Sequence, residues 1–251
     1  MKLTFLGTRA WIAASNRRHR RHSALLVAYH GRRLMVDCGA DWRGRLDRVK
    51  PDAIVLTHAH PDHAWGLRDG FDGPVLATVD TWADLDDYPL ADRRTLAPRT
   101  PTDLAGVTIE AFPVLHATRA PTVALELTGD ATLLYAPDVV DITDRAAALA
   151  GVDLYIGDGV SLTRSHVRRA GGTLVGHTTI RAQLGWCAEA GVARALHPLR
   201  HGDRRGRRAL ARPRARAHGA RAGRRRRLRP RRAGGGARRR SRRQPGAIAA
   251  R

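Results

Sequence analysis

The sequence holds only two cysteines, Cys38 and Cys187, among its 251 residues. That number excludes the disulfide framework of a small secreted protein and favours a reducing compartment. No apolar run approaches the ~18 residues that a membrane-spanning helix requires, and the first ten residues lack the apolar stretch of a signal peptide. From these absences we expect a soluble, cytoplasmic protein that makes no use of a membrane.

Acidic residues are nearly missing from the end of the chain. Residues 200–251 hold 22 arginines against one acid, Asp203, whereas residues 1–199 hold 23 Lys and Arg against 22 Asp and Glu. The formal net charge of +22 therefore describes the tail, and the body of the protein is close to neutral. The positive charge could therefore attract nucleic acid to these last residues, but it gives no reason to expect such binding by the rest of the chain.

The same tail has little that could form a core. Aromatic residues make up 5% of the whole sequence and are absent after residue 203. In that segment the aliphatic side chains larger than alanine are Leu210, Leu228 and Ile248. They bury too little surface to offset the entropy of ordering the chain. We therefore divide the sequence into a folded domain, residues 1–196, and an irregular, disordered tail, residues 197–251.

Within the first two hundred residues, nine apolar runs have the length and the β-branched content of strands. They cover residues 2–7, 24–29, 33–39, 52–58, 73–79, 107–114, 122–128, 131–137 and 152–159. Segments typical of helices lie between them, at 41–49, at 80–88 opened by Asp80, at 141–150 opened by Asp141, and at 177–190. Early strands cluster as hairpins and later ones mix with helices. This order favours an α/β fold with two sheets flanked by helices over a strict βαβ alternation.

The stretch IVLTHAHPDH, residues 54–63, ends an apolar strand in three histidines and an aspartate. In an extended strand end, His58 and His60 point to one side, and Asp62 and His63 follow Pro61 on a short helical turn. Neutral imidazoles and carboxylates suit Zn²⁺, Mn²⁺ or Fe²⁺, and two neighbouring points indicate two divalent metal ions. The alternative is a polar loop with chance histidines, but burying these four groups without a metal would be costly.

This His-x-His-x-Asp-His pattern after an apolar strand resembles the metallo-β-lactamase fold hydrolases. The resemblance runs from residue 1 to about residue 196, and its supporting marks occur in order: FLGT, LMVDCG, FPVLHAT and LLYAPDVV. It implies a four-layer αββα sandwich. It also implies two ligand sets that share one aspartate: His58, His60 and His116 for one metal, Asp62 and His63 for the other, and Asp138 as the bridge.

Each of the later assignments has a plainer alternative. Alone, His116 would be a packed strand histidine, and Asp138 would be a turn aspartate. Asp37 is a candidate to orient a ligand histidine, since ligating imidazoles donate their other N–H to a second group. It can equally be part of a strand-end turn.

Two metals that share a water imply a metal-bound hydroxide for hydrolysis, with Asp62 beside it. Phosphodiesters, thioesters and lactams all fit this chemistry. His177, expected at a helix start, favours the branch that includes tRNA 3′-processing nucleases and cyclic-phosphate phosphodiesterases, where it would protonate a leaving alkoxide. The alternative is a helix-capping or solvent-facing His177.

The loop NRRHRRH, residues 16–22, offers guanidinium groups for phosphate or is simply solvated.

Only 52 residues separate His63 from His116, which leaves little room for a tRNA-clamping arm. We therefore expect a small phosphodiester or a nucleotide-like substrate, and a homodimer is compatible with the sequence. Three alternatives stay open. The chain can cleave thioesters or lactams, it can bind nucleic acid non-specifically through its arginine tail, or it can be an inactive copy.

The family ordinarily ends its site with a Thr-His pair after an apolar strand, and here the sequence differs. His197 stands in the threonine position and Pro198 in the histidine position. His197 is our candidate for the last ligand, and His201 is a weaker one.

Our hypothesis for both the missing histidine and the arginine tail is that the residues from about 197 onward are the product of a frameshift. Residues 197–204 can be encoded as CAC CCA CTG CGG CAC GGA GAT CGT followed by C, and reading one base later gives Thr-His-Cys-Gly-Thr-Glu-Ile-Val. We expect resequencing of the gene to reveal a shift near this codon. An intact frame through it would contradict the explanation.

Overall fold

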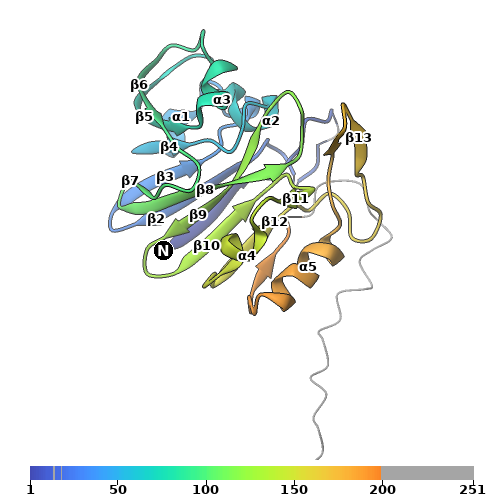
Figure 1. The fold of residues 1–251 in the computed structure, drawn as a ribbon. Coiled ribbons are helices and arrows are strands. Elements are labelled where there is room, and N and C mark those ends of the chain that lie inside the picture. Colours follow the sequence, from blue (N-terminus) through green and yellow to red (C-terminus); the bar gives the residue numbers. More distant parts are fainter. Residues whose placement is uncertain (14, 18, 199–251) are drawn as a thin grey trace, which may run out of the picture. The chain divides into compact units, whose positions relative to one another are not determined.

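The computed structural model describes residues 1–13, 15–17 and 19–198 (Figure 1). Residues 199–251 of the predicted tail (197–251), which include the candidate ligand His201, lie outside the described residues. The expected disorder of the tail and the domain boundary at residue 196 therefore remain predictions. Within the described part of the chain, no helix is long and apolar enough to cross a membrane.

The first sheet contains six strands that follow one another in chain order. They are β1 (Lys2–Gly7), β2 (Ala24–Tyr29), β3 (Arg32–Val36), β4 (Ala53–Val55), β5 (Phe71–Ala77) and β6 (Leu90–Thr95). The pairs from β1 to β3 are antiparallel and those from β3 to β6 are parallel. Parallel pairs need crossover connections. Short helices occupy them: η1 (Ala40–Trp42), α1 (Leu46–Val49), α2 (Pro61–Ala64), η2 (Trp65–Leu67) and α3 (Val79–Ala83).

The second sheet has the order β11-β8-β9-β10-β12-β15, with β7 paired to β8. Its strands are β7 (Thr102–Leu104), β8 (Val107–Leu115), β9 (Thr122–Thr128), β10 (Thr132–Ala136), β11 (Asp141–Ile142), β12 (Leu154–Gly157) and β15 (Ala195–Leu196). The helices α4 (Arg145–Leu149) and α5 (Ile180–Glu189) connect its parallel strands. A separate hairpin, β13 (Arg168–Ala170) and β14 (Thr173–Val175), precedes α5.

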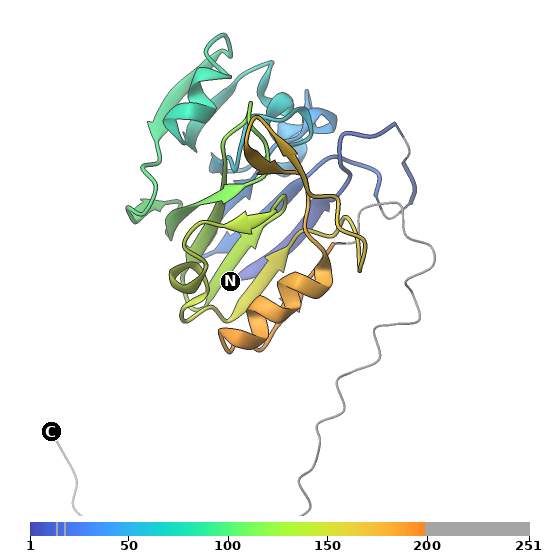
Figure 2. The same cartoon turned by 45° about the vertical axis from the view of Figure 1, so that its right-hand side comes forward.

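Three apolar clusters lie between four layers. The largest joins the two sheets and includes Leu25, Val27, Leu125 and Ile156. A second cluster packs the short helices of the first sheet onto its other face, and a third packs α4 and α5 onto the second sheet. Figures 1 and 2 show the two sheets face to face with helices on both outer sides. The predicted αββα sandwich is confirmed.

Strand β2 shows why its sequence is apolar without interruption. Leu25 and Val27 point into the cluster between the sheets, whereas Ala24 and Leu26 belong to the cluster under the helices. Because successive side chains of a strand point to opposite faces, a strand covered on both faces needs apolar residues at every position.

The starts of three helices differ from the prediction. Thr78, not Asp80, caps α3 by accepting a hydrogen bond from the backbone N–H of Thr81. Asp141 lies in β11, and Asp144 caps α4. The last helix begins at Ile180 after the cap Thr179, so His177 precedes it. In each case the Thr or Asp directly before the helix accepts a hydrogen bond from a backbone N–H of the first turn.

The strands β6, β7, β11, β13 and β14 were not predicted. They are polar or no more than three residues long, and β6 reads LADRRT. They form because a neighbouring strand edge supplies hydrogen bonds, which a search for apolar runs does not detect.

Substitution Leu125→Ala should lower the free energy of unfolding by about 2–5 kcal/mol, because it leaves a cavity between the two sheets. Urea denaturation followed by circular dichroism measures this loss. The matched control is Leu184→Ala on α5, where the leucine is 40% exposed and a small effect is expected. Equal losses for the two variants would contradict the placement of the core.

Candidate metal centre

The motif His-x-His-x-Asp-His follows β4, as the sequence predicts. His60 is the last residue before α2, and Pro61 occupies the first position of that helix, where a missing N–H costs nothing. The short helix turns Asp62 and His63 inward, and both side chains are buried. His58 is buried in the preceding extended segment.

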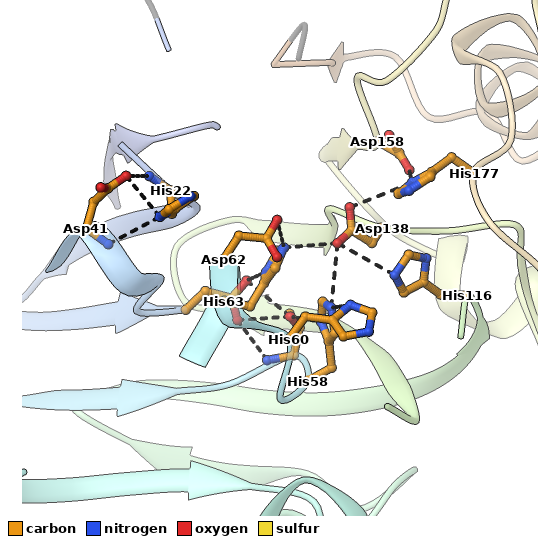
Figure 3. Close-up of polar contacts among 12 residues, drawn as sticks. His22, Asp41, His58, His60, Asp62, His63, His116, Asp138, Asp158 and His177 are labelled. Atoms are coloured by element: carbon orange, nitrogen blue, oxygen red, sulfur yellow. Dashed lines mark hydrogen bonds and ion pairs between the residues drawn. The ribbon is translucent and has the colours of Figure 1, made fainter. Parts of the chain in front are cut away.

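Four side chains from separate parts of the chain make the first ligand group: His58, His60, His116 and Asp138. Each offers one ligand atom, and these atoms all lie within 4.8 Å of one another. Nε2 of His58 lies 2.9 Å from Nδ1 of His60. His116 follows β8 and Asp138 follows β10, so the second sheet brings both to the motif of the first (Figure 3).

Asp62, His63 and Asp138 make a second ligand group. Nε2 of His63 lies 2.9 Å from Oδ2 of Asp138 and 3.5 Å from Oδ2 of Asp62. The same Oδ2 of Asp138 lies 3.6 Å from Nε2 of His58 and 3.8 Å from Nε2 of His116. Asp138 thus belongs to both groups, which is the position that a bridging ligand requires.

The protonation of the histidines fits a cation site. Burial lowers the pKa of His58 well below its ordinary value and that of His60 to about 4. Neutral imidazole is the form that binds metals. Burial also acts to lower the pKa of His63, but Asp37, Asp62 and Asp138 outweigh it and raise that pKa well above the ordinary value. A cation in place of the His63 proton would balance the same carboxylates.

Each of three histidine rings also has a hydrogen-bond partner at Nδ1, and this contact fixes the orientation of the ring. Oδ2 of Asp37 lies 2.7 Å from Nδ1 of His63, and the hydroxyl of Thr57 lies 3.0 Å from Nδ1 of His58. Nδ1 of His116 donates to the carbonyl oxygen of Gly176 at 2.9 Å. With Nδ1 engaged, each ring presents Nε2 for a ligand bond. Asp37 itself has φ 60°, a strained backbone conformation of the kind found at functional sites.

The structure also brings His177 to this centre. Its Nδ1 lies 2.6 Å from Oδ2 of Asp158 and 3.8 Å from Oδ1 of Asp138. Asp138, Asp158 and His177 form a third group of potential ligands. The sequence prediction missed Asp158, which is fully buried. The sequence feature that could have identified Asp158 is its position directly after an apolar strand, the same feature that marked Asp138.

His197 lies apart from the three ligand groups. Its Nδ1 lies 3.1 Å from the carbonyl oxygen of Asp158. Nε2 is buried and has no hydrogen-bond partner among the described residues. Strand β15 pairs with β12 and so places His197 beside Asp158 rather than beside Asp62 and His63. The second ligand group therefore lacks the contribution that the sequence assigned to His197.

The loop at residues 16–22 makes contacts of its own. Nδ1 of His22 lies 2.9 Å from Oδ2 of Asp41, which also binds Arg9 (Figure 3). Arg21 stacks over the ring of Trp42, 4.6 Å from its centroid. The expected guanidinium groups of this loop are absent from the pocket beside the metal centre, as far as the described residues show.

A family model described as the beta-lactamase superfamily domain matches residues 32–197. The chain belongs to this superfamily. Among curated proteins, it is 43% identical over 70 residues to ribonuclease Z of Bradyrhizobium diazoefficiens, which is 26% of this chain and 22% of that one. It is 35% identical over 83 residues to ribonuclease Z of Methanopyrus kandleri, or 31% of this chain and 27% of that one. The matched segments cover about a quarter of the length of each of these two ribonucleases.

Solved structures of this superfamily share the fold over much greater lengths. A diphosphatase from the PhnP family matches with a TM-score of 0.60 and 19% identity, over 79% of this chain and 86% of that one. The short form of human tRNase Z matches with a TM-score of 0.56 and 18% identity, over 78% and 92% of the two chains. The resemblance drawn from the sequence motifs is confirmed at the level of family and fold.

If Asp138 is shared by both ligand groups, Asp138→Ala should reduce the zinc content of the purified protein from about two equivalents to less than one. Plasma mass spectrometry after zinc loading and dialysis measures it. Asp141→Asn is the control, because Asp141 lies three residues away and pairs with Arg145 instead. Unchanged zinc in Asp138→Ala would refute the shared position.

Proposed function

We propose that the chain is a dinuclear metal-dependent hydrolase that cleaves a small phosphodiester or a nucleotide-like substrate. The observation that carries the proposal is the position of Asp138, which belongs to two ligand groups and also adjoins the His177–Asp158 pair. A nucleophile site and a proton donor then lie within one cluster. Zinc is the expected metal, and the same donors also suit manganese and iron.

The donor set fits two divalent ions, because it combines imidazole nitrogens with buried carboxylate oxygens, and a cation beside His63 would replace the proton that the neighbouring carboxylates favour. When bound, such ions lower the pKa of a coordinated water and neutralise charge on the oxygens of the substrate. Asp62 has one role as a ligand and a second as an acceptor for a proton of the attacking water. Its burial beside His63 keeps bulk water from competing for that contact.

His177 is assigned as the proton donor to the leaving group. Its side chain is 25% exposed and lines the pocket next to the metal centre. Asp158 holds Nδ1 and stabilises the protonated ring, and Nε2 is assigned as the nitrogen that donates its proton to the substrate. An alkoxide needs such a proton, whereas the thiolate of a thioester does not. The pair therefore favours phosphodiester cleavage over the thioester alternative, whereas a lactam nitrogen would also need a proton.

The pocket has a volume of about 490 Å³, within the usual range for small-molecule sites. His60, His116 and His177 form its inner wall. The names of the relatives, ribonuclease Z and a diphosphatase, also point to phosphoester chemistry. A pocket of this size and the short chain between His63 and His116 support a small substrate. Non-specific contacts between the arginine tail and nucleic acid are a further expectation.

One observation favours a second candidate function. The chain would then be an inactive member of the superfamily whose second metal site is incomplete. His197 is not within reach of Asp62 and His63 as a member of their ligand group. A protein of this kind would hold one metal firmly and turn over slowly or not at all. Nucleic-acid binding by its tail would then be its remaining activity.

Two substrates separate the roles of the histidines. His60→Ala should lower hydrolysis of both bis(p-nitrophenyl) phosphate and the dinucleotide ApA by more than about 10²-fold, since a metal ligand is lost. His177→Ala should slow ApA by roughly 10²-fold and affect the nitrophenyl ester much less, because nitrophenolate leaves without a proton.

Steady-state rates with added zinc measure both effects, and His30→Ala, an exposed histidine on the β2–β3 turn, is the control. Hydrolysis that survives His60→Ala would contradict the metal-centre assignment. Equal losses on the two substrates in His177→Ala would contradict the proton-donor assignment.

A further inference from the structure

A small hairpin forms the outer wall of the pocket. It consists of β13 and β14, and its ends are tied together by a hydrogen bond of 3.0 Å from the N–H of His166 to the carbonyl oxygen of His177. The N–H of Gly176 donates to the carbonyl oxygen of His116 at 2.8 Å, and Nδ1 of His116 binds Gly176 in return. The hairpin is therefore fixed to a candidate metal ligand and to the candidate proton donor.

Gly176 makes this attachment possible. Its φ is 110°, a conformation that side chains rarely adopt, and a Cβ there would lie 2.2 Å from the carbonyl oxygen of His166. The base of the hairpin is thus tightly closed. A side chain on its inner face has a defined position relative to the metal centre.

The pocket wall is basic. The residues that line it are His60, His116, Ala117, Thr118, Arg119, Val160, His166, Arg168, Ala170, Val175, Gly176 and His177, with no carboxylate among them. Arg168 and Ala170 line it from alternate positions of β13, so Arg169 between them points away. Arg119 approaches from the loop after β8.

Neither guanidinium group of Arg119 and Arg168 has a hydrogen-bond or ion-pair partner within the described part of the chain. Among the described residues, several arginines elsewhere in the domain form ion pairs: Arg9 with Asp41, Arg43 with Asp69, Arg94 with Asp92, Arg99 with Glu110, and Arg145 with Asp141. Acids are therefore available to this domain, yet none is placed next to these two cations. Two unpaired guanidinium groups on one wall leave a place for an external anion.

We propose that Arg119 and Arg168 form a subsite for a second phosphate of the substrate, beside the phosphodiester that is cleaved. This inference rests on the proposed function and narrows its substrate class to compounds that carry a phosphomonoester as well as the scissile bond. A phosphate dianion offers enough oxygens for two guanidinium forks, and one arginine would suffice for a carboxylate.

The test compares ApA with the same dinucleotide carrying a 5′-phosphate or a 3′-phosphate. The zinc-loaded protein should cleave one of the two phosphorylated forms with a kcat/KM roughly tenfold or more above that of ApA. Arg119→Gln and Arg168→Gln should each reduce that preference roughly three- to tenfold, because each removes a charge-assisted contact at an exposed site.

Arg169→Gln is the matched control, since Arg169 lies on the same strand but outside the pocket wall. It should keep the preference. Circular dichroism checks that all three variants fold. Cleavage of ApA without preference for either phosphorylated form would overturn the subsite and leave the proposed function standing. A preference lost equally in Arg169→Gln would also overturn it.

A binding measurement keeps the inference testable if no dinucleotide is cleaved, an outcome that would instead count against the proposed function. Calorimetry should show that adenosine 3′,5′-bisphosphate binds the protein more tightly than adenosine 5′-monophosphate, and that Arg168→Gln removes most of the difference. Equal affinities for the two nucleotides in the unmodified protein would refute the subsite.

Discussion

The carboxylate of Asp138 is the contact on which the candidate site depends. It is buried, and its Oδ2 faces Nε2 atoms of His58, His63 and His116 at 3.6, 2.9 and 3.8 Å. A buried charge is costly unless cations or hydrogen-bond donors surround it. Removing Asp138 would take one oxygen ligand from both groups at once and leave the histidines facing one another. The arrangement of the whole centre follows from satisfying this carboxylate.

The αββα fold brings the required side chains together from distant parts of the chain. Strand β4 of the first sheet leads into the histidine motif, whereas β8, β10 and β12 of the second sheet lead into His116, Asp138 and Asp158. Packing the two sheets through the central apolar cluster places these strand ends at one edge of the sandwich. The candidate metal centre thus depends on contacts between the sheets, because each of the two ligand groups that include the histidine motif also needs Asp138 from the second sheet.

Motifs with local geometry could be predicted from the sequence. The pattern from His58 to His63 lies on one strand end and one helical turn, so its spacing alone predicts convergence. Strands β1, β2 and β9 were predicted to the residue from their apolar and β-branched runs; β2 and β9 are largely buried, whereas β1 is exposed or half-buried throughout. His116 and Asp138 needed the family resemblance, since no local pattern joins them to the motif.

Other features depend on tertiary contacts that a single sequence does not reveal. Asp158 acts through a partner 19 residues away, and it resembles any turn aspartate after a strand. The hairpin of β13 and β14 carries two adjacent arginines, Arg168 and Arg169, which look alike in the sequence. Only the fold distinguishes the one that lines the pocket. His197 was assigned by its place in the family order, but the pairing of β15 with β12 directs it to Asp158.

Anomalous diffraction from crystals of the zinc-loaded protein tests the central claim most directly. The account predicts two peaks at the zinc edge, one among His58, His60 and His116 and the other beside Asp62 and His63, with the carboxylate of Asp138 in contact with both. A peak pair that leaves Asp138 outside the coordination of either ion, or the absence of any peak at these histidines, would contradict it.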